Sequence, residues 1–211
     1  MVTMGKDSLQ RQSIRRLKPS TWLNDEVMNL VNKHLTSQTF ARLSKAVTGR
    51  KPSYVMSTYF LQSLLDLKNN DPTRRRKVNY ENVKNWARKV KVVDGDLFKL
   101  AFLHFPFNID DVHWTLVSVS FEDKLIVYYD SMHGEDPVVA YAVYEYLIHH
   151  HIEMHGENFD IDNWRVILKP TGEEFTTHYS SYPMQENGEL FCFPSLYYHS
   201  LITSHTQLHR L

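Results

Sequence analysis

The chain has little cysteine, no net charge and no long apolar run. One cysteine among 211 residues excludes an intrachain disulfide framework and is typical of a reducing compartment, nuclear or cytoplasmic. The 24 basic and 24 acidic residues cancel, which argues against nucleic acid or a membrane surface as the main partner. No apolar stretch approaches the roughly 20 residues that span a bilayer, and residues 1–10 lack the apolar core of a signal peptide. These absences predict a soluble intracellular protein.

The composition that is present suits one compact domain. Hydrophobic residues make up 42% of the chain and aromatic residues 13%, which is enough for one substantial core. One domain that contains both helices and strands is therefore favoured over two. Residues 1–16 are polar, with scattered arginines, and are expected to be a flexible N-terminal lead-in.

Two strand-like segments, residues 112–120 and 125–131, flank a charged turn at residues 121–124 and predict an antiparallel hairpin. His113 opens the first arm and Asp130 closes the second, so pairing places their side chains opposite or diagonal, roughly 5 to 8 Å apart. A carboxylate there can hold an imidazole in one tautomer and stabilise its charged form, as a general base requires. On the hairpin alone, a buried histidine and an aspartate that starts a turn is the favoured alternative.

Other elements are predicted from apolar spacing and capping residues. A cap at Ser20 or Thr21 predicts a helix with apolar residues from Leu23 to Leu35, and a loop over residues 36–52 follows. Further helices are expected at residues 53–67, 82–90 and 136–150, a solvated loop at 68–77, and a last strand at 163–168. With the hairpin arms, a strand at residues 98–105 gives a central sheet of 98–105, 114–121 and 124–130.

Four histidines within residues 149–155 raise the possibility of a metal site. His151 and His155 are four residues apart and would share one helical face. The run lacks the HExxH pattern, and no second ligand cluster accompanies it. We therefore expect a solvated helix end, with no metal and no other cofactor.

Four segments occur in an order that resembles the Ulp/SENP family of cysteine proteases, which process SUMO and related ubiquitin-like modifiers. They are PSTWLNDEVMNL at residues 19–30, HW at 113–114, YDSMHG at 129–134 and PMQENG at 183–188. The resemblance implies an α+β, papain-like fold of the Ulp/adenain type, with a central mixed sheet flanked by helices, in one domain of residues 17–211. It also implies a monomer that hydrolyses the bond after a Gly-Gly tail, with SUMO or another ubiquitin-like modifier and its conjugates as partners.

The resemblance assigns roles to individual residues. His113 would take and return the proton, Asp130 would orient His113, and Gln185 would steady the oxyanion. Trp22 would form one wall of a narrow channel for the Gly-Gly tail, and Trp114 is expected to flank the same groove. A flat indole wall suits glycine because only a residue without a side chain lets the backbone approach so closely.

The match to the family's Gln-x-Asn-Gly-x-Asp-Cys-Gly motif ends at Gly188. Without a gap, Phe191 occupies the nucleophile position and Cys192 falls where glycine belongs. A one-residue shift restores Cys192 as the nucleophile, but Phe193 then follows it and a side chain there crowds the site.

The last segment, residues 189–211, is atypical: from Leu190 onward it contains no acidic residue and one basic residue, Arg210. Gene decay, a frameshift or read-through would break the family pattern in this way, and a divergent but functional end is the milder alternative. Three hypotheses stay open. The chain is an active protease that uses Cys192, a pseudoprotease that binds a modifier without cutting it, or a degraded protein without stable function.

Overall fold

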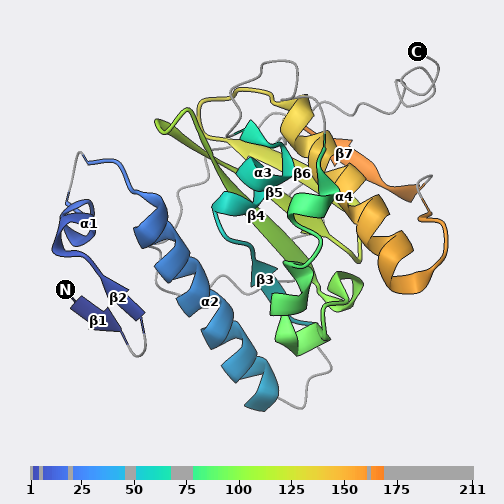
Figure 1. Cartoon of the computed structure of the whole chain (residues 1–211), viewed down its shortest axis with the longest axis horizontal. Helices are drawn as coiled ribbons and strands as arrows, with labels where there is room; N and C mark the ends of the chain where they lie inside the picture. The colour runs from blue at the N-terminus through green and yellow to red at the C-terminus, as the bar shows by residue number, and fades with distance from the viewer. Residues whose placement is uncertain are drawn as a thin grey trace.

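A computed structural model describes residues 2–4, 7–18, 21–45, 51–67, 78–160 and 163–168. A five-stranded mixed sheet with the order β3-β4-β5-β6-β7 lies at its centre (Figure 1). The strands are β3 (Ser53–Val55), β4 (Phe102–Ile109), β5 (His113–Ser120), β6 (Leu125–Asp130) and β7 (Arg165–Ile167). The three long middle strands pair antiparallel, and the two short edge strands pair parallel to their neighbours. The expected α+β fold with a central mixed sheet is confirmed.

Three helices accompany the sheet: α2 (Asp25–Lys45), α3 (Tyr59–Leu64) and α4 (Pro137–His155). Figure 1 shows α2 on one flank of the sheet and α4 on the other. Within the described residues, one-turn 3-10 helices precede β4: η3 (Tyr80–Asn82), η4 (Ala87–Lys89), η5 (Lys91–Val93) and η6 (Leu97–Lys99). The main core lies where α3 and α4 meet the sheet, and its fully buried members include Phe60, Phe105 and Tyr146.

The predicted hairpin is confirmed as β5 and β6, joined by a turn at residues 121–124. Asp130 pairs with Thr115, which places His113 two residues further along on the same face of the sheet, in the diagonal position. The predicted strand at residues 98–105 is confirmed in part, because β4 begins only at Phe102. Together these three strands form the expected core of the sheet.

Helix α4 connects the parallel strands β6 and β7, as a crossover between parallel strands requires. Its start follows the expected signals: Val139 N–H donates to the Asp136 carboxylate over 3.2 Å, and Pro137 occupies the first turn. The helix runs past the predicted end at residue 150 to His155. It ends at Gly156, whose φ of 69° lies in the left-handed region that glycine adopts without strain.

Three predicted elements differ from the structure in whole or in part. Residues 36–45 continue α2 instead of forming a loop, and Asn24, three residues past the predicted cap, accepts a bond from Val27 N–H over 3.2 Å. The predicted helix at residues 53–67 is confirmed in part as α3. Its first residues, 53–55, form β3 instead, because they pair with β4 and sheet pairing overrides local preference. Residues 82–90 form 3-10 turns instead of one α-helix. The expected loop at residues 68–77 lies outside the described residues.

The expected flexible lead-in contains regular structure. Strands β1 (Val2–Met4) and β2 (Asp7–Leu9) pair antiparallel, and α1 (Arg11–Arg15) follows them. Both β2 and α1 contact α2, and Figure 1 shows this N-terminal segment beside α2. The boundary of the domain at residue 17 stays a prediction. Within the described ranges, no helix is long and apolar enough to span a bilayer.

His104 on β4 predicts a loss of stability in acid. Its Nδ1 lies 2.8 Å from Ser118 Oγ, and burial lowers the pKa of the imidazole from 6.5 to about 4. The unfolded chain therefore binds a proton first, so the contribution to stability is complete above about pH 6.5 and is lost as the pH falls toward 4. We expect His104→Gln to remove about 1 to 3 kcal/mol of the pH dependence of the free energy of unfolding.

The measurement is urea denaturation at a series of pH values between about 7.5 and 4. His34→Gln is the control, because His34 is an exposed histidine on α2. Equal pH slopes for the parent and His104→Gln would contradict the prediction.

Candidate active site

His113 and Asp130 are in direct contact at the end of the hairpin. Nε2 of His113 lies 2.6 Å from Oδ1 of Asp130, and the two side chains are 15% and 8% exposed. Met132 N–H also donates to Oδ1 of Asp130, over 2.7 Å, which fixes the carboxylate. Since the carboxylate occupies Nε2, Nδ1 is the ring nitrogen left for a reacting group. The geometry is that of a histidine base held in one tautomer by a carboxylate.

Gly134 leaves room for that carboxylate. A Cβ atom at this position would lie 2.5 Å from Oδ2 of Asp130, closer than real Cβ atoms come to a neighbouring atom. The turn that brings Gly134 back to Asp130 is closed by a bond of 3.1 Å from His133 N–H to the Asp130 carbonyl. A side chain at residue 134 would therefore require the Asp130 carboxylate to move.

Gly134→Ala is expected to displace the Asp130 carboxylate from His113. Crowding a packed site in this way costs about 1 to 3 kcal/mol of stability. The imidazole N–H proton of His113, observed by NMR, should lose its protection from solvent exchange. Ser131→Ala is the control, since Ser131 is exposed in the same turn. Retention of both stability and a protected His113 proton in Gly134→Ala would show that the close approach is not constraining.

Trp114 joins the site to the start of α2. Its indole Nε1–H donates to the Leu23 carbonyl over 3.0 Å, so the segments that carry Trp114 and Trp22 lie side by side. Trp22 is 66% exposed, which is unusual for such a large apolar side chain. This placement agrees with the expectation that the two residues are near each other. A groove between them stays a prediction.

Two apolar residues beside the pair were not singled out from the sequence. Val112, which precedes His113, is 60% exposed, and Met132, two residues after Asp130, is 72% exposed. The sequence signal that could have identified them was their position close to His113 and Asp130, which lie on opposite arms of the hairpin. Gln185, Phe191 and Cys192 lie outside the described residues, so their expected roles stay predictions.

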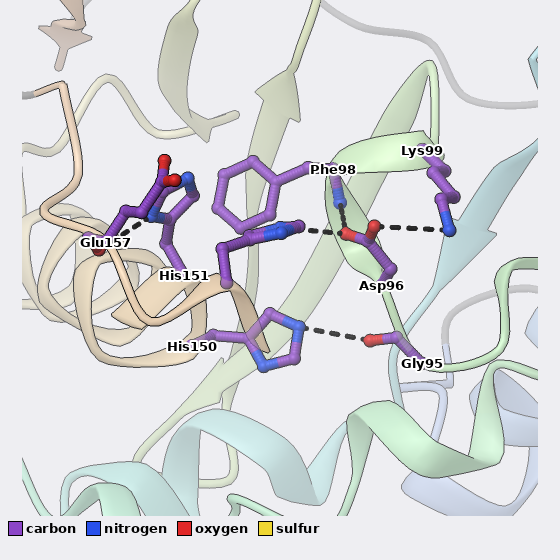
Figure 2. A network of polar contacts seen from close by, with 8 residues as sticks. Gly95, Asp96, Phe98, Lys99, His150, His151 and Glu157 are labelled. Atoms are coloured by element: carbon purple, nitrogen blue, oxygen red, sulfur yellow. Dashed lines mark hydrogen bonds and ion pairs between the residues drawn. The ribbon is translucent and has the colours of Figure 1, made fainter. Parts of the chain in front are cut away.

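The histidine run belongs to a separate polar network, shown in Figure 2. His150 is buried, its Nε2 lies 3.1 Å from the Gly95 carbonyl, and burial lowers its pKa. His155 lies 3.4 Å from the Asp96 carboxylate, and the rings of His151 and His155 contact Phe98. The expected solvated helix end is therefore wrong in part, because this end packs on residues 95–99. No group of three or more metal-binding side chains occurs within the described ranges.

Residues 21–171 match the Ulp1 protease family, C-terminal catalytic domain. This match covers more than half of the chain and contains both arms of the hairpin, the exposed tryptophan and the His113–Asp130 pair. The chain belongs to the Ulp1 protease family, as its sequence motifs indicated.

Individual relatives agree with the family match. Ubiquitin-like-specific protease 1A of Arabidopsis thaliana is 28% identical over 176 residues, which is 83% of this chain and 30% of that protein. Sentrin-specific protease 5 of Homo sapiens is 26% identical over 130 residues, which is 62% of this chain and 14% of that protein. The chain thus spans less than a third of the length of either relative.

Solved structures show the same fold. A de-sumoylating protease superposes with a TM-score of 0.58 at 20% identity, over 77% of this chain and 59% of that one. The SUMO protease Ulp1 with its catalytic cysteine oxidized to a sulfinic acid gives 0.55 at 21% identity, over 74% and 63%. The Ulp1 protease domain in complex with Smt3, the yeast ortholog of SUMO, gives 0.50 at 22% identity, over 71% and 58%.

Proposed function

We propose that the chain is a cysteine-protease domain that recognises the Gly-Gly tail of SUMO or another ubiquitin-like modifier, free or conjugated. The observation that carries the proposal is the 2.6 Å contact between His113 and Asp130 at the end of the hairpin. Trp114, the residue after His113, also bonds to Leu23, the neighbour of the exposed Trp22. The chain's similarity to a ubiquitin-like-specific protease, a de-sumoylating protease and the Ulp1 protease domain bound to Smt3 supports the proposal. We further propose that the domain acts as a monomer in the nucleus or cytoplasm, without nucleic acid, membrane, metal or cofactor.

The proposed chemistry is acyl transfer to a thiol. His113 takes the thiol proton of Cys192 at Nδ1, and Asp130 stabilises the imidazolium through Nε2. The thiolate attacks the carbonyl carbon of the second glycine of the tail, and Gln185 donates a hydrogen bond to the developing oxyanion. His113 returns the proton to the leaving amine, which leaves a thioester. Water, deprotonated by the same imidazole, then releases the carboxylate of the modifier and the free thiol.

A second candidate is a pseudoprotease that binds the same tail without cutting it. The observation in its favour is the register after Gly188, in which Phe191 stands where the family has its nucleophile. Phe191 and Phe193 also flank the only cysteine in the sequence, and apolar neighbours favour a protonated thiol. Cys192 is then a poor nucleophile at neutral pH.

The experiment that separates these functions uses a SUMO with a C-terminal electrophile after Gly-Gly. Covalent labelling of Cys192 that is lost in His113→Ala supports the protease. Saturable binding without labelling supports the pseudoprotease. A panel of modifiers that neither bind nor label the chain would refute both candidates.

Trp22→Ala and Trp114→Ala are each expected to weaken binding of a Gly-Gly-ended modifier. Loss of a buried aromatic anchor costs about 1 to 3 kcal/mol of binding free energy. Calorimetric titration measures the affinities, and Met154→Ala, which truncates an exposed side chain on α4, is the control. Trp114→Phe separates lost packing from the lost bond to Leu23. Unchanged affinity in both alanine variants would show that the tail binds elsewhere.

A further inference from the structure

The N-terminal segment of residues 7–18 is attached to the start of α2 by a network of hydrogen bonds. Ser13, only 4% exposed, donates its hydroxyl hydrogen to the Glu26 carboxylate and accepts a bond of 3.1 Å from the Asn24 side chain. Gln10 N–H donates to the other Glu26 oxygen over 3.3 Å. Asn24 uses its carbonyl oxygen to cap α2 at Val27 N–H. One serine hydroxyl therefore connects α1 to both the cap and the first turn of α2.

This network lies next to the segment that carries Trp22. On the N-terminal side, the Arg16 guanidinium donates to the Trp22 carbonyl over 3.4 Å, and the Thr21 hydroxyl donates to the Arg16 carbonyl over 2.8 Å. On the C-terminal side, the Leu23 carbonyl accepts the indole N–H of Trp114. The Trp22 side chain itself is 66% exposed, so the contacts that hold this residue are made by its backbone and its neighbours.

We propose that residues 7–18 act as a clamp that holds the Trp22 segment against Trp114, and that Ser13 is its positioning residue. Without the clamp, the hydrogen bond between the Leu23 carbonyl and the Trp114 indole opens more often. The position of Trp22 relative to His113 is then no longer fixed. An exposed aromatic wall contributes affinity when it is already ordered before the ligand arrives. The link to the modifier tail rests on the proposed function, whereas the link between Ser13 and the Trp114 indole does not.

Ser13→Ala removes the donor to Glu26 and leaves that carboxylate without its partner. The first readout needs no ligand: hydrogen exchange of the Trp114 indole N–H, followed by NMR, should become at least about tenfold faster. The indole protons of Trp86 and Trp164, which pack in or against the core, should be unchanged and so exclude general unfolding. Ser37→Ala is the matched control, because Ser37 is an exposed serine of α2 whose hydroxyl donates to the carbonyl of Lys33.

The second readout is affinity for SUMO that ends in Gly-Gly, which should fall about threefold to thirtyfold in Ser13→Ala. Ser13→Thr, which keeps the hydroxyl, should restore part of both effects, and Glu26→Gln, which keeps one acceptor oxygen, should reproduce the faster exchange if Ser13→Ala folds poorly. Unchanged indole exchange in Ser13→Ala and Glu26→Gln overturns the clamp. Faster exchange with unchanged affinity overturns its role in binding. Absence of binding by the parent chain to SUMO and to the other modifiers of the panel refutes the proposed function alone, and the indole exchange then decides the clamp.

Discussion

The triple variant Leu190→Asp, Phe191→Cys, Cys192→Gly is expected to cleave a SUMO fusion through Gly-Gly far faster than the parent chain. In the ungapped register, Phe191 takes the family's nucleophile position, and the three changes restore the thiol, its acidic neighbour and the small residue behind it. His113, Asp130 and Gln185 need no change. Loss of a complete nucleophile–base unit costs on the order of a millionfold in rate, and misplacement by about 1 Å costs about a hundredfold. A gain of about ten-thousandfold is therefore expected.

The control is the same triple variant with His113→Ala, assayed by gel for release of the modifier. Activity that appears in the triple variant and disappears with His113→Ala supports both the register and the role of His113. A second control, Cys192→Ala in the parent chain, tests the shifted register. Cleavage by the parent that is lost in Cys192→Ala would contradict the ungapped register and the pseudoprotease together.

The hairpin could be predicted because its determinants are local. Apolar alternation, one charged turn and the two-residue period of strands place His113 and Asp130 on the same face, and the register confirms it. Strand β3 could not be predicted in this way, because Ser53–Val55 form a strand only by pairing with β4, about 50 residues away. Local preference decided the first case, and tertiary pairing decided the second.

The candidate site also contains residues that local sequence predicts and residues whose roles depend on tertiary structure. The His113–Asp130 pair followed from spacing, but the need for Gly134 depends on where the Asp130 carboxylate lies in three dimensions. Ser13 looked like part of a polar lead-in because its partner, Glu26, is 13 residues away on another helix. The contact between His150 and the Gly95 carbonyl could not be predicted from the sequence either, since 55 residues separate them.

Phe60→Ala is expected to cost about 3 to 5 kcal/mol of the free energy of unfolding, the range for truncating a buried aromatic side chain. Phe60 is fully buried on α3, and its ring centroid lies 4.9 Å from those of Phe105 on β4 and Tyr146 on α4 and 5.5 Å from that of Trp86. It thus joins two helices to the strand that precedes the His113 hairpin. A domain with the usual stability of about 5 to 15 kcal/mol would lose a large part of it.

Urea denaturation followed by tryptophan fluorescence measures this loss, and Tyr59→Ala is the matched control. Tyr59 is the preceding residue of the same helix and is 46% exposed, so its truncation should cost well under half as much. Phe60→Leu, which keeps part of the apolar volume, should fall between the two. β4 pairs with β5 along its whole length, from Phe102–Ser120 to Ile109–His113. Loss of packing at Phe60 should therefore also destabilise the hairpin. Equal stability of Phe60→Ala and Tyr59→Ala would show that this aromatic cluster does not hold the sheet to its helices.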